Sequence, residues 1–144
     1  MSGELRQSFT AMGCDCELQI FAAAPAIAQA AAKAALAEVH RIETKFSRYR
    51  STSAVARINA AAGMEPCVVD PESAGQIDYA LPSWQPRAGA FDLTSGVLRR
   101  AWNFHNGALP SPEQVAELMP LVGWHKVRWE PPTLFMPLAG MELD

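Results

Sequence analysis

The sequence has no strong excess of charge of either sign, few cysteines and no long apolar run. Twelve basic against fifteen acidic side chains leave a formal charge of −3, so no basic surface is indicated for a nucleic acid or an anionic membrane. Three cysteines cannot all pair internally, and Cys14 and Cys16 are only two residues apart. We therefore expect free thiols and a cytoplasmic protein rather than a disulfide framework.

The most apolar stretch, residues 20–37, is interrupted by Pro25, Gln29 and Lys33 and falls short of a transmembrane helix. A secretory or lipoprotein signal needs a basic end and an unbroken apolar segment, and neither precedes residues 21–26 or Cys14. The expectation is a chain without a transmembrane segment. Its 144 residues, 49% of them hydrophobic, suit one globular domain.

Hydrophobic periodicity predicts an α+β fold, with an early hairpin, helices covering one face and strands near the end. The expected strands are a hairpin or bulged pair within residues 6–20 and short strands at 66–69, 126–129, 133–136 and 141–143. The expected helices are residues 25–46, a short one after the serines at 51–53, one opening at 70–72, one entered from the turn at 91–96, and one from Ser111 to near 122–123.

Two details of these helices are specific enough to test. Leu36, Val39 and Ile42 recur with Phe46 at steps of three and four, so this stripe is expected in the core. Pro82 is expected to stop the third helix, with Pro86 beyond it, because proline lacks the amide and clashes with the preceding turn.

The common catalytic templates are missing from the sequence. It contains no Gly-rich phosphate loop, no Gly-x-Ser-x-Gly and no histidine pair at helical metal spacing. Cys14 and Cys16 would face the same side of a strand, which leaves a thiol module that binds a metal or is redox active open as one alternative.

Three segments combine an aromatic ring or a thioether with a tight backbone feature. They are Met12 beside Gly13, Tyr49 between Arg48 and Arg50, and residues 89–94 where a helix begins. Each suits a flat ring or a polar ligand, and each is equally compatible with an ordinary core, surface or capping role. The downstream Arg99 and Arg100 would add positive potential, although a solvated face is the favoured interpretation for them.

Four segments in this order resemble the FAD:protein FMN transferase (ApbE) family, long described as thiamine-biosynthesis lipoproteins. They are residues 10–13 (TAMG), 43–49 (ETKFSRY), 53–59 (SAVARIN), and 89–98 (GAFDLTSGVL) followed by 101–104 (AWNF). The last of these is the most specific. The resemblance implies the N-terminal portion of an ApbE-like fold, related to the T-fold, with an antiparallel or mixed sheet and helices packed on one face.

The resemblance implies an enzyme that cleaves the pyrophosphate of FAD with bound Mg²⁺ and transfers FMN to a threonine of a target flavoprotein. It implies that Met12 lines the adenine pocket, that Tyr49 packs on a flavin ring and that Asp92 accepts a hydrogen bond. The implied FAD contacts are Met12, Tyr49, Ala90, Phe91, Asp92 and Asp144. No catalytic residue or metal ligand is assigned within the chain.

Departures from the family pattern shape the final expectation. Cys14 stands where the family has threonine, Pro82 and Pro86 fall where a helix normally leads into a Gly-rich turn, and the sequence ends at Asp144, before the Gly-rich and metal-binding half. We therefore expect residues 1–144 to be the FAD-cradle part of a transferase, incomplete as an enzyme. The alternative is a non-catalytic flavin-binding or interaction fragment, and unpaired strands predict a possible homo-oligomer.

Overall fold

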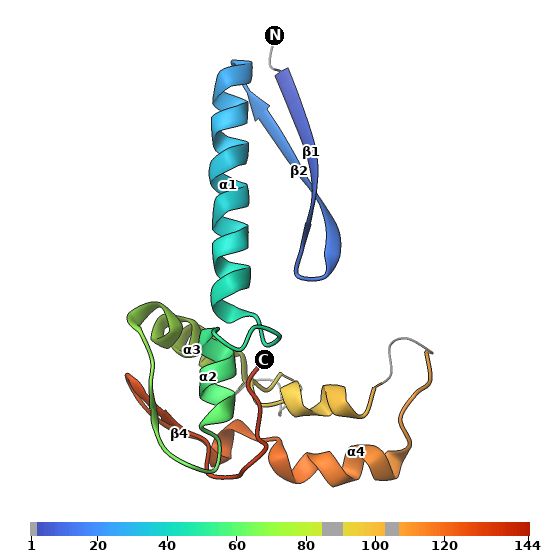
Figure 1. Ribbon diagram of the computed structural model, residues 1–144, viewed down its shortest axis with the longest axis vertical. Helices are drawn as coiled ribbons and strands as arrows, with labels where there is room; N and C mark the ends of the chain where they lie inside the picture. The colour runs from blue at the N-terminus through green and yellow to red at the C-terminus, as the bar shows by residue number, and fades with distance from the viewer. Residues whose placement is uncertain (1–2, 85–90, 103–106) are drawn as a thin grey trace. The chain divides into compact units, whose positions relative to one another are not determined.

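The computed structural model describes residues 3–84, 91–102 and 107–144. The chain forms two compact units, Met1–Ser53 and Ala54–Asp144, and each is described by itself. The elements, with η for a 3₁₀ helix, are β1 (Gly3–Ala11), β2 (Cys14–Ala22), α1 (Pro25–Phe46), α2 (Ala54–Ala60), β3 (Cys67–Val68), α3 (Pro71–Trp84), η2 (Gly96–Arg100), α4 (Pro112–Leu118), η3 (Met119–Leu121), η4 (Trp124–Lys126), β4 (Arg128–Glu130) and β5 (Thr133–Phe135) (Figure 1). This combination confirms the predicted α+β class.

The first unit is a β-hairpin with one long helix along it. Strands β1 and β2 pair antiparallel in unbroken register from Gly3 opposite Ala22 to Ala11 opposite Cys14, so the predicted hairpin is confirmed, is longer than expected and has no bulge. The turn consists of Met12 and Gly13, both with positive φ (53° and 74°), which matches the right-handed twist of paired strands.

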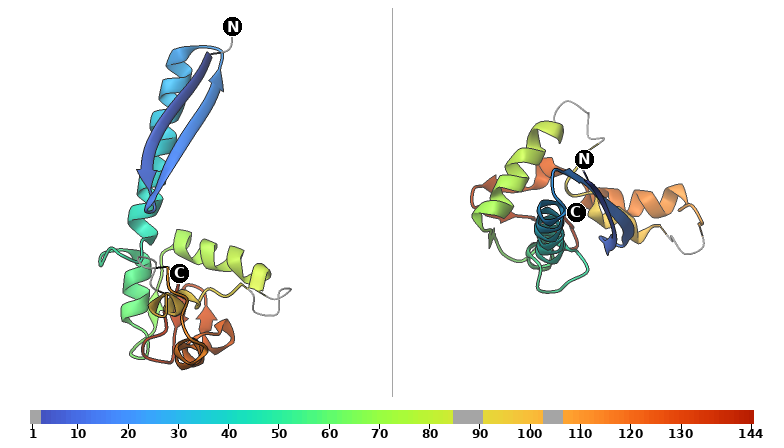
Figure 2. Two further views of the ribbon diagram at one scale, coloured as in Figure 1. Left: turned by 90° about the vertical axis from the view of Figure 1, so that its right-hand side faces the viewer. Right: turned by 90° about the horizontal axis from the view of Figure 1, so that it is seen from above.

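Helix α1 spans the predicted residues and begins with Pro25 in its first turn. It packs against both strands of the hairpin, as Figure 2 shows in side view. Its buried residues are Ala28 and Ala32, whereas the predicted core stripe of Leu36, Val39, Ile42 and Phe46 is only half-buried. The stripe prediction was wrong because small alanine side chains, and not the large ones, form the tightest contact of the helix.

The second unit has one hydrophobic core under a small antiparallel sheet of order β3-β5-β4. The buried members of the core are Ile58, Ala62, Val69, Ile77, Trp124, Leu134, Met136, Met141 and Leu143. They come from α2, α3, β5, η4 and the last residues of the chain, so those last residues pack as core. The predicted hairpin across Pro131 and Pro132 is confirmed as β4 and β5, and the peptide bond between the two prolines is cis.

Three boundaries differ from the sequence predictions. Pro82 lies inside α3, which continues to Trp84 because only the last turn loses an amide there; Pro86 lies outside the described residues. Residues 141–143 form no strand, and a single parallel bridge joins Ser95 to Glu142. Helix α4 ends at Leu118, and η3 extends this path to Leu121, close to the predicted end.

The cysteines and the helices bear on two further predictions, free thiols and the lack of a transmembrane helix. Cys14, Cys16 and Cys67 are all free thiols, as predicted. Within residues 3–84, 91–102 and 107–144, no helix combines the length and the apolar character needed to cross a bilayer.

Candidate functional site

In the first unit, Met12 is held at the hairpin turn by α1. The residue is 67% exposed, and its backbone N–H donates to Glu43 Oε1 at 2.7 Å. Glu43 lies in the last turns of α1 and also contacts His40, whose Nδ1 is 3.6 Å from Oε2. The carboxylate of Glu43 therefore holds Met12, an exposed residue with a left-handed backbone, at the turn. No role for Glu43 was predicted from the sequence.

Tyr49 follows α1 in the same unit and presents its ring to solvent, with 79% of the residue exposed. Its backbone N–H donates to Ser47 Oγ at 3.2 Å. The Arg48 guanidinium carbon lies 5.2 Å from the centre of the ring, a cation–π contact. An exposed ring beside a cation can stack on a planar, electron-rich partner.

In the second unit, Asp92 closes a turn before η2. Its Oδ1 accepts hydrogen bonds from Thr94 N (2.8 Å) and Thr94 Oγ1 (2.6 Å), and its Oδ2 accepts one from Trp124 N (2.9 Å). The fully buried Thr94 hydroxyl oxygen in turn accepts from Gly123 N at 2.7 Å. This connected polar chain joins residues 91–94 to the start of η4.

Asp144 lies on the backbone segment next to that turn. Its N–H donates to Leu93 O at 3.0 Å, and Leu93 is the residue directly after Asp92. Asp144 is exposed, while Met141, Glu142 and Leu143 before it are buried. The structure thus brings Asp92 and Asp144, two implied FAD contacts, onto adjoining segments of one unit. Phe91 is 39% exposed beside them, and Ala90 lies outside the described residues.

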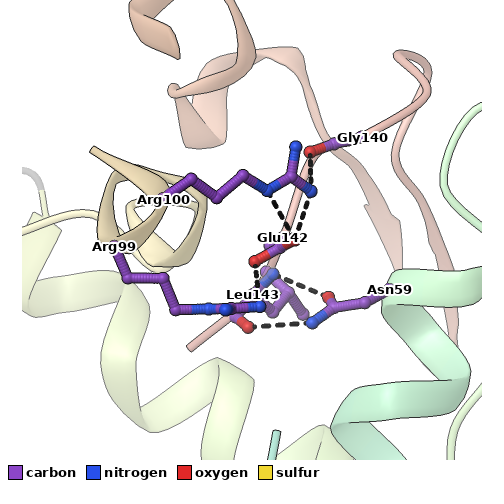
Figure 3. A network of polar contacts seen from close by, with 6 residues as sticks. All are labelled: Asn59, Arg99, Arg100, Gly140, Glu142 and Leu143. Atoms are coloured by element: carbon purple, nitrogen blue, oxygen red, sulfur yellow. Dashed lines mark hydrogen bonds and ion pairs between the residues drawn. The ribbon is translucent and has the colours of Figure 1, made fainter. Parts of the chain in front are cut away.

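A network around Glu142 anchors the segment that leads to Asp144 (Figure 3). Glu142 is 9% exposed; its Oε2 is 2.8 Å from Arg99 Nη2, and its Oε1 accepts from Arg100 Nε at 3.1 Å. Both arginines are exposed, as the favoured interpretation expected, and both also bind a nearly buried carboxylate. The arginine side chains are 37% and 43% exposed, so water screens these ion pairs on the arginine side.

Asn59 of α2 binds the same segment from the other side. Its Nδ2 donates to Leu143 O at 3.1 Å and its Oδ1 accepts from Leu143 N at 2.7 Å, so one amide holds both polar groups of a backbone residue (Figure 3). Sequence reasoning missed Asn59 and Glu142, although Asn59 lies in one of the quoted segments and Glu142 in the strand expected at 141–143. A charged residue between two apolar ones was a signal at Glu142, but nothing local identified its partners.

The structure places no third metal-binding side chain close enough to Cys14 and Cys16, among the described residues, to complete a metal site. Cys14 Sγ lies 3.8 Å from Met12 O, and Cys16 Sγ lies 3.7 Å from Cys14 O. In the part of the chain that is described, no three or more His, Cys, Asp or Glu side chains gather closely enough to hold a metal ion. An open hollow of about 550 Å³ on the hairpin contains no implied FAD contact; its lining residues are Ser8, Phe9, Thr10, Asp15, Cys16 and Glu17.

The fold and the two adjoining carboxylate segments define an α+β protein with a candidate ligand-binding edge on its second unit. The model of the ApbE family matches residues 12–144, and the chain belongs to that family.

Relatives with names or solved structures share this fold over nearly the whole chain. A protein named FAD:protein FMN transferase from Treponema pallidum is 31% identical over 146 aligned positions, which cover 92% of this chain and 40% of that protein. The ApbE protein of Thermotoga maritima superposes with a TM-score of 0.81 at 28% identity, covering 100% of this chain and 47% of that one. The flavin transferase ApbE of Vibrio cholerae gives the same TM-score at 21% identity, covering 100% and 48%. This chain therefore spans less than half the length of these relatives.

Proposed function

We propose that this chain is the FAD-cradle portion of a FAD:protein FMN transferase. The observation that carries the proposal is the juxtaposition, in an ApbE-family chain, of the turn at Asp92 with the exposed Asp144. The 31% identity to a named FAD:protein FMN transferase supports FAD as the ligand. The finer parts of the proposal are magnesium dependence and a threonine of a target flavoprotein as acceptor.

Each unit, taken by itself, carries side chains that suit a part of FAD. The Met12 thioether and the Tyr49 ring are exposed apolar surfaces for planar rings, and each lies on its own fixed backbone feature. In the second unit, Phe91 offers a half-exposed ring, and Asp92 and Asp144 offer acceptors for hydroxyl or amino groups. These residues would bind and orient FAD, and none of them is assigned as a nucleophile.

The proposed reaction exchanges one phosphorus–oxygen bond for another. The threonine oxygen bonds to the phosphorus of the FMN part, the pyrophosphate bond breaks, AMP leaves and the threonine proton passes to solvent. Such a transfer depends on positioning and charge neutralisation more than on a covalent protein intermediate. Bound magnesium would neutralise charge on the pyrophosphate. Among the described residues, no three His, Cys, Asp or Glu side chains gather closely enough to hold a metal ion, and no ligand for magnesium is assigned to them.

A second candidate function is a flavin-binding or interaction module without catalysis. It is favoured by the exposed Met12 and Tyr49, which suit the binding of a flat ring without any reaction. The test is incubation of the chain with FAD, Mg²⁺ and a threonine-containing peptide of a flavoprotein, followed by mass spectrometry, with the peptide's Thr→Ala form as the control. A peptide carrying FMN would establish the transferase for this chain. FAD binding without product, which we expect for the 144-residue form, would leave the cradle role and exclude transfer by this chain alone.

A further inference from the structure

The segment Met141–Asp144 changes from buried to exposed within four residues. Met141 is fully buried, Glu142 and Leu143 are 9% and 6% exposed, and Asp144 is exposed. Among the described residues, the backbone of this segment joins no regular strand: it has the bridge from Ser95 to Glu142 and the bonds from Met141 N to Leu138 O and from Asp144 N to Leu93 O. Side chains from elsewhere in the unit therefore contribute to fixing its position.

Asn59 binds the residue directly before Asp144. It bonds both the N–H and the C=O of Leu143, at 2.7 and 3.1 Å, across 84 residues of sequence. A side-chain amide paired with both groups of one residue replaces the two ladder bonds that a neighbouring strand would have provided. Asn59 is itself only half-buried, so its amide is not required to fill a core position.

Three further contacts restrict the movement of this segment. Glu142 is bound by Arg99 and Arg100 on the side away from Asn59 (Figure 3). Gly96 packs so closely that a Cβ there would lie 3.0 Å from Asp144 Cβ and 3.1 Å from Glu142 O. Asp144 N–H, finally, donates to Leu93 O at 3.0 Å. The backbone of Asp144 is thus fixed from two directions, and the residue is exposed.

We propose that Asn59 is a positioning residue for Asp144: by clamping Leu143 it holds the Asp144 carboxylate where it meets the ligand of this site. The inference rests on the proposed function, because that ligand is FAD. Asn59 itself does not touch FAD. Its effect on affinity passes through Asp144, and it therefore disappears when the Asp144 carboxylate is absent.

The test combines Asn59→Ala with Asp144→Ala in a double-mutant cycle of FAD affinity, with amide hydrogen exchange by NMR as a second measurement. Asn59→Ala should raise the FAD dissociation constant about tenfold, the effect of one displaced hydrogen-bonding group. It should also speed exchange at the Leu143 and Asp144 amides about tenfold or more relative to the core amides of β5. In the Asp144→Ala background, adding Asn59→Ala should leave FAD affinity unchanged.

The matched control is Asp78→Ala. It removes another long-range side-chain bond of the same unit, the one from Trp129 Nε1 to Asp78 Oδ1 at 2.7 Å, and it should change neither exchange at Leu143 nor FAD affinity. Asn59→Asp keeps the acceptor for Leu143 N–H and should have an intermediate effect, which separates positioning from loss of folding.

Three results would overturn the inference. They are unchanged exchange at Leu143 and Asp144 in Asn59→Ala, unchanged FAD affinity in that variant, and an equal loss of affinity with and without the Asp144 carboxylate. If the wild-type chain binds no FAD, the proposed function fails by itself. Exchange at Leu143 and Asp144 then decides whether Asn59 fixes Asp144.

Discussion

The Asp92 carboxylate accepts a hydrogen bond from the backbone N–H of Trp124 at 2.9 Å, 32 residues further along the chain. Its other oxygen accepts from both the N–H and the hydroxyl of Thr94. Asp92, which the family resemblance implies as a ligand contact, therefore also joins two loops of the second unit by hydrogen bonds. The proposed ligand contact and the stability of the second unit depend on the same side chain, so variants of Asp92 must be measured for both.

Asp92→Ala should lower the free energy of unfolding by about 2–3 kcal/mol, because three donors lose a charged, partly buried acceptor. Asp92→Asn should cost less, since one amide oxygen remains to accept. Urea unfolding followed by tryptophan fluorescence would measure both, as Trp124 is 7% exposed in the folded unit. Equal urea midpoints for wild type and Asp92→Ala would show that the hydrogen bonds of Asp92 do not stabilise the unit.

Gly96→Ala should destabilise the second unit by about 1–3 kcal/mol, because the added methyl group meets the backbone of residues 142–143 at 3.1 and 3.2 Å. Gly75 provides a matched control. It lies inside α3, nothing is within 4 Å of a Cβ added there, and Gly75→Ala should stabilise by about 0.5–1 kcal/mol. Thermal unfolding should move in opposite directions for the two variants. A shift of the same sign in both would contradict the close packing at Gly96.

Ser111→Ala removes the capping box of α4, in which Ser111 Oγ accepts from Gln114 N at 3.3 Å and Gln114 Oε1 accepts from Ser111 N at 2.8 Å. The free energy of unfolding should fall by about 1 kcal/mol.

The pKa of Glu113 lies below its ordinary value of 4.5. Its own backbone N–H and, to a smaller extent, the Ser111 hydroxyl donate hydrogen bonds to the carboxylate and stabilise its charged form.

That lowered pKa also sets the sign of a pH effect. A carboxyl group with a lower pKa in the folded state contributes stability above about pH 4.5, and the contribution is lost as the pH falls through the folded-state pKa. In Ser111→Ala the pKa of Glu113 should rise toward 4.5. A ¹³C titration of the Glu113 carboxyl would show it, and an unchanged pKa would mean that the serine hydroxyl does not reach the carboxylate.

Glu43→Ala should release the Met12 turn, because the Met12 N–H loses its acceptor at 2.7 Å. We expect exchange at the Met12 amide to rise about fivefold to tenfold, the equivalent of about 1 kcal/mol. Glu43→Gln keeps an acceptor and should restore most of the protection. Lys33→Ala, an exposed change elsewhere on α1, should have no effect. If the Met12 amide stays protected from exchange in Glu43→Ala, the pairing of β1 and β2 is enough to fix the turn, and Glu43 is not needed.

Local signals predicted those parts of the fold that depend on neighbouring residues. The limits of α1 follow from Pro25 and the alanine-rich run, the start of α4 follows from the Ser111 capping box, and the β4–β5 hairpin follows from its proline turn. The same local reasoning failed at Pro82, since a proline near the end of a helix removes only one amide that the last turn would use.

The candidate site depended on contacts between distant residues, which periodicity does not reveal. The resemblance indicated Asp92 and Asp144, but not that Leu93 would join them through a backbone bond. The roles of Asn59 and Glu142 rest on partners 84 and 42 residues away. These side-chain contacts form when the whole unit packs, so the folded structure is needed to find them.

Titration of the wild-type chain with FAD, followed by flavin fluorescence, tests the cradle role most directly. We expect saturable binding with a dissociation constant at or below about 100 µM, or about −5.5 kcal/mol. Asp144→Ala should weaken binding about tenfold or more, whereas Glu65→Ala, an exposed acidic residue beyond α2, should not. Absence of binding at about 100 µM FAD, or equal affinity of wild type and Asp144→Ala, would contradict the assignment of this edge to FAD.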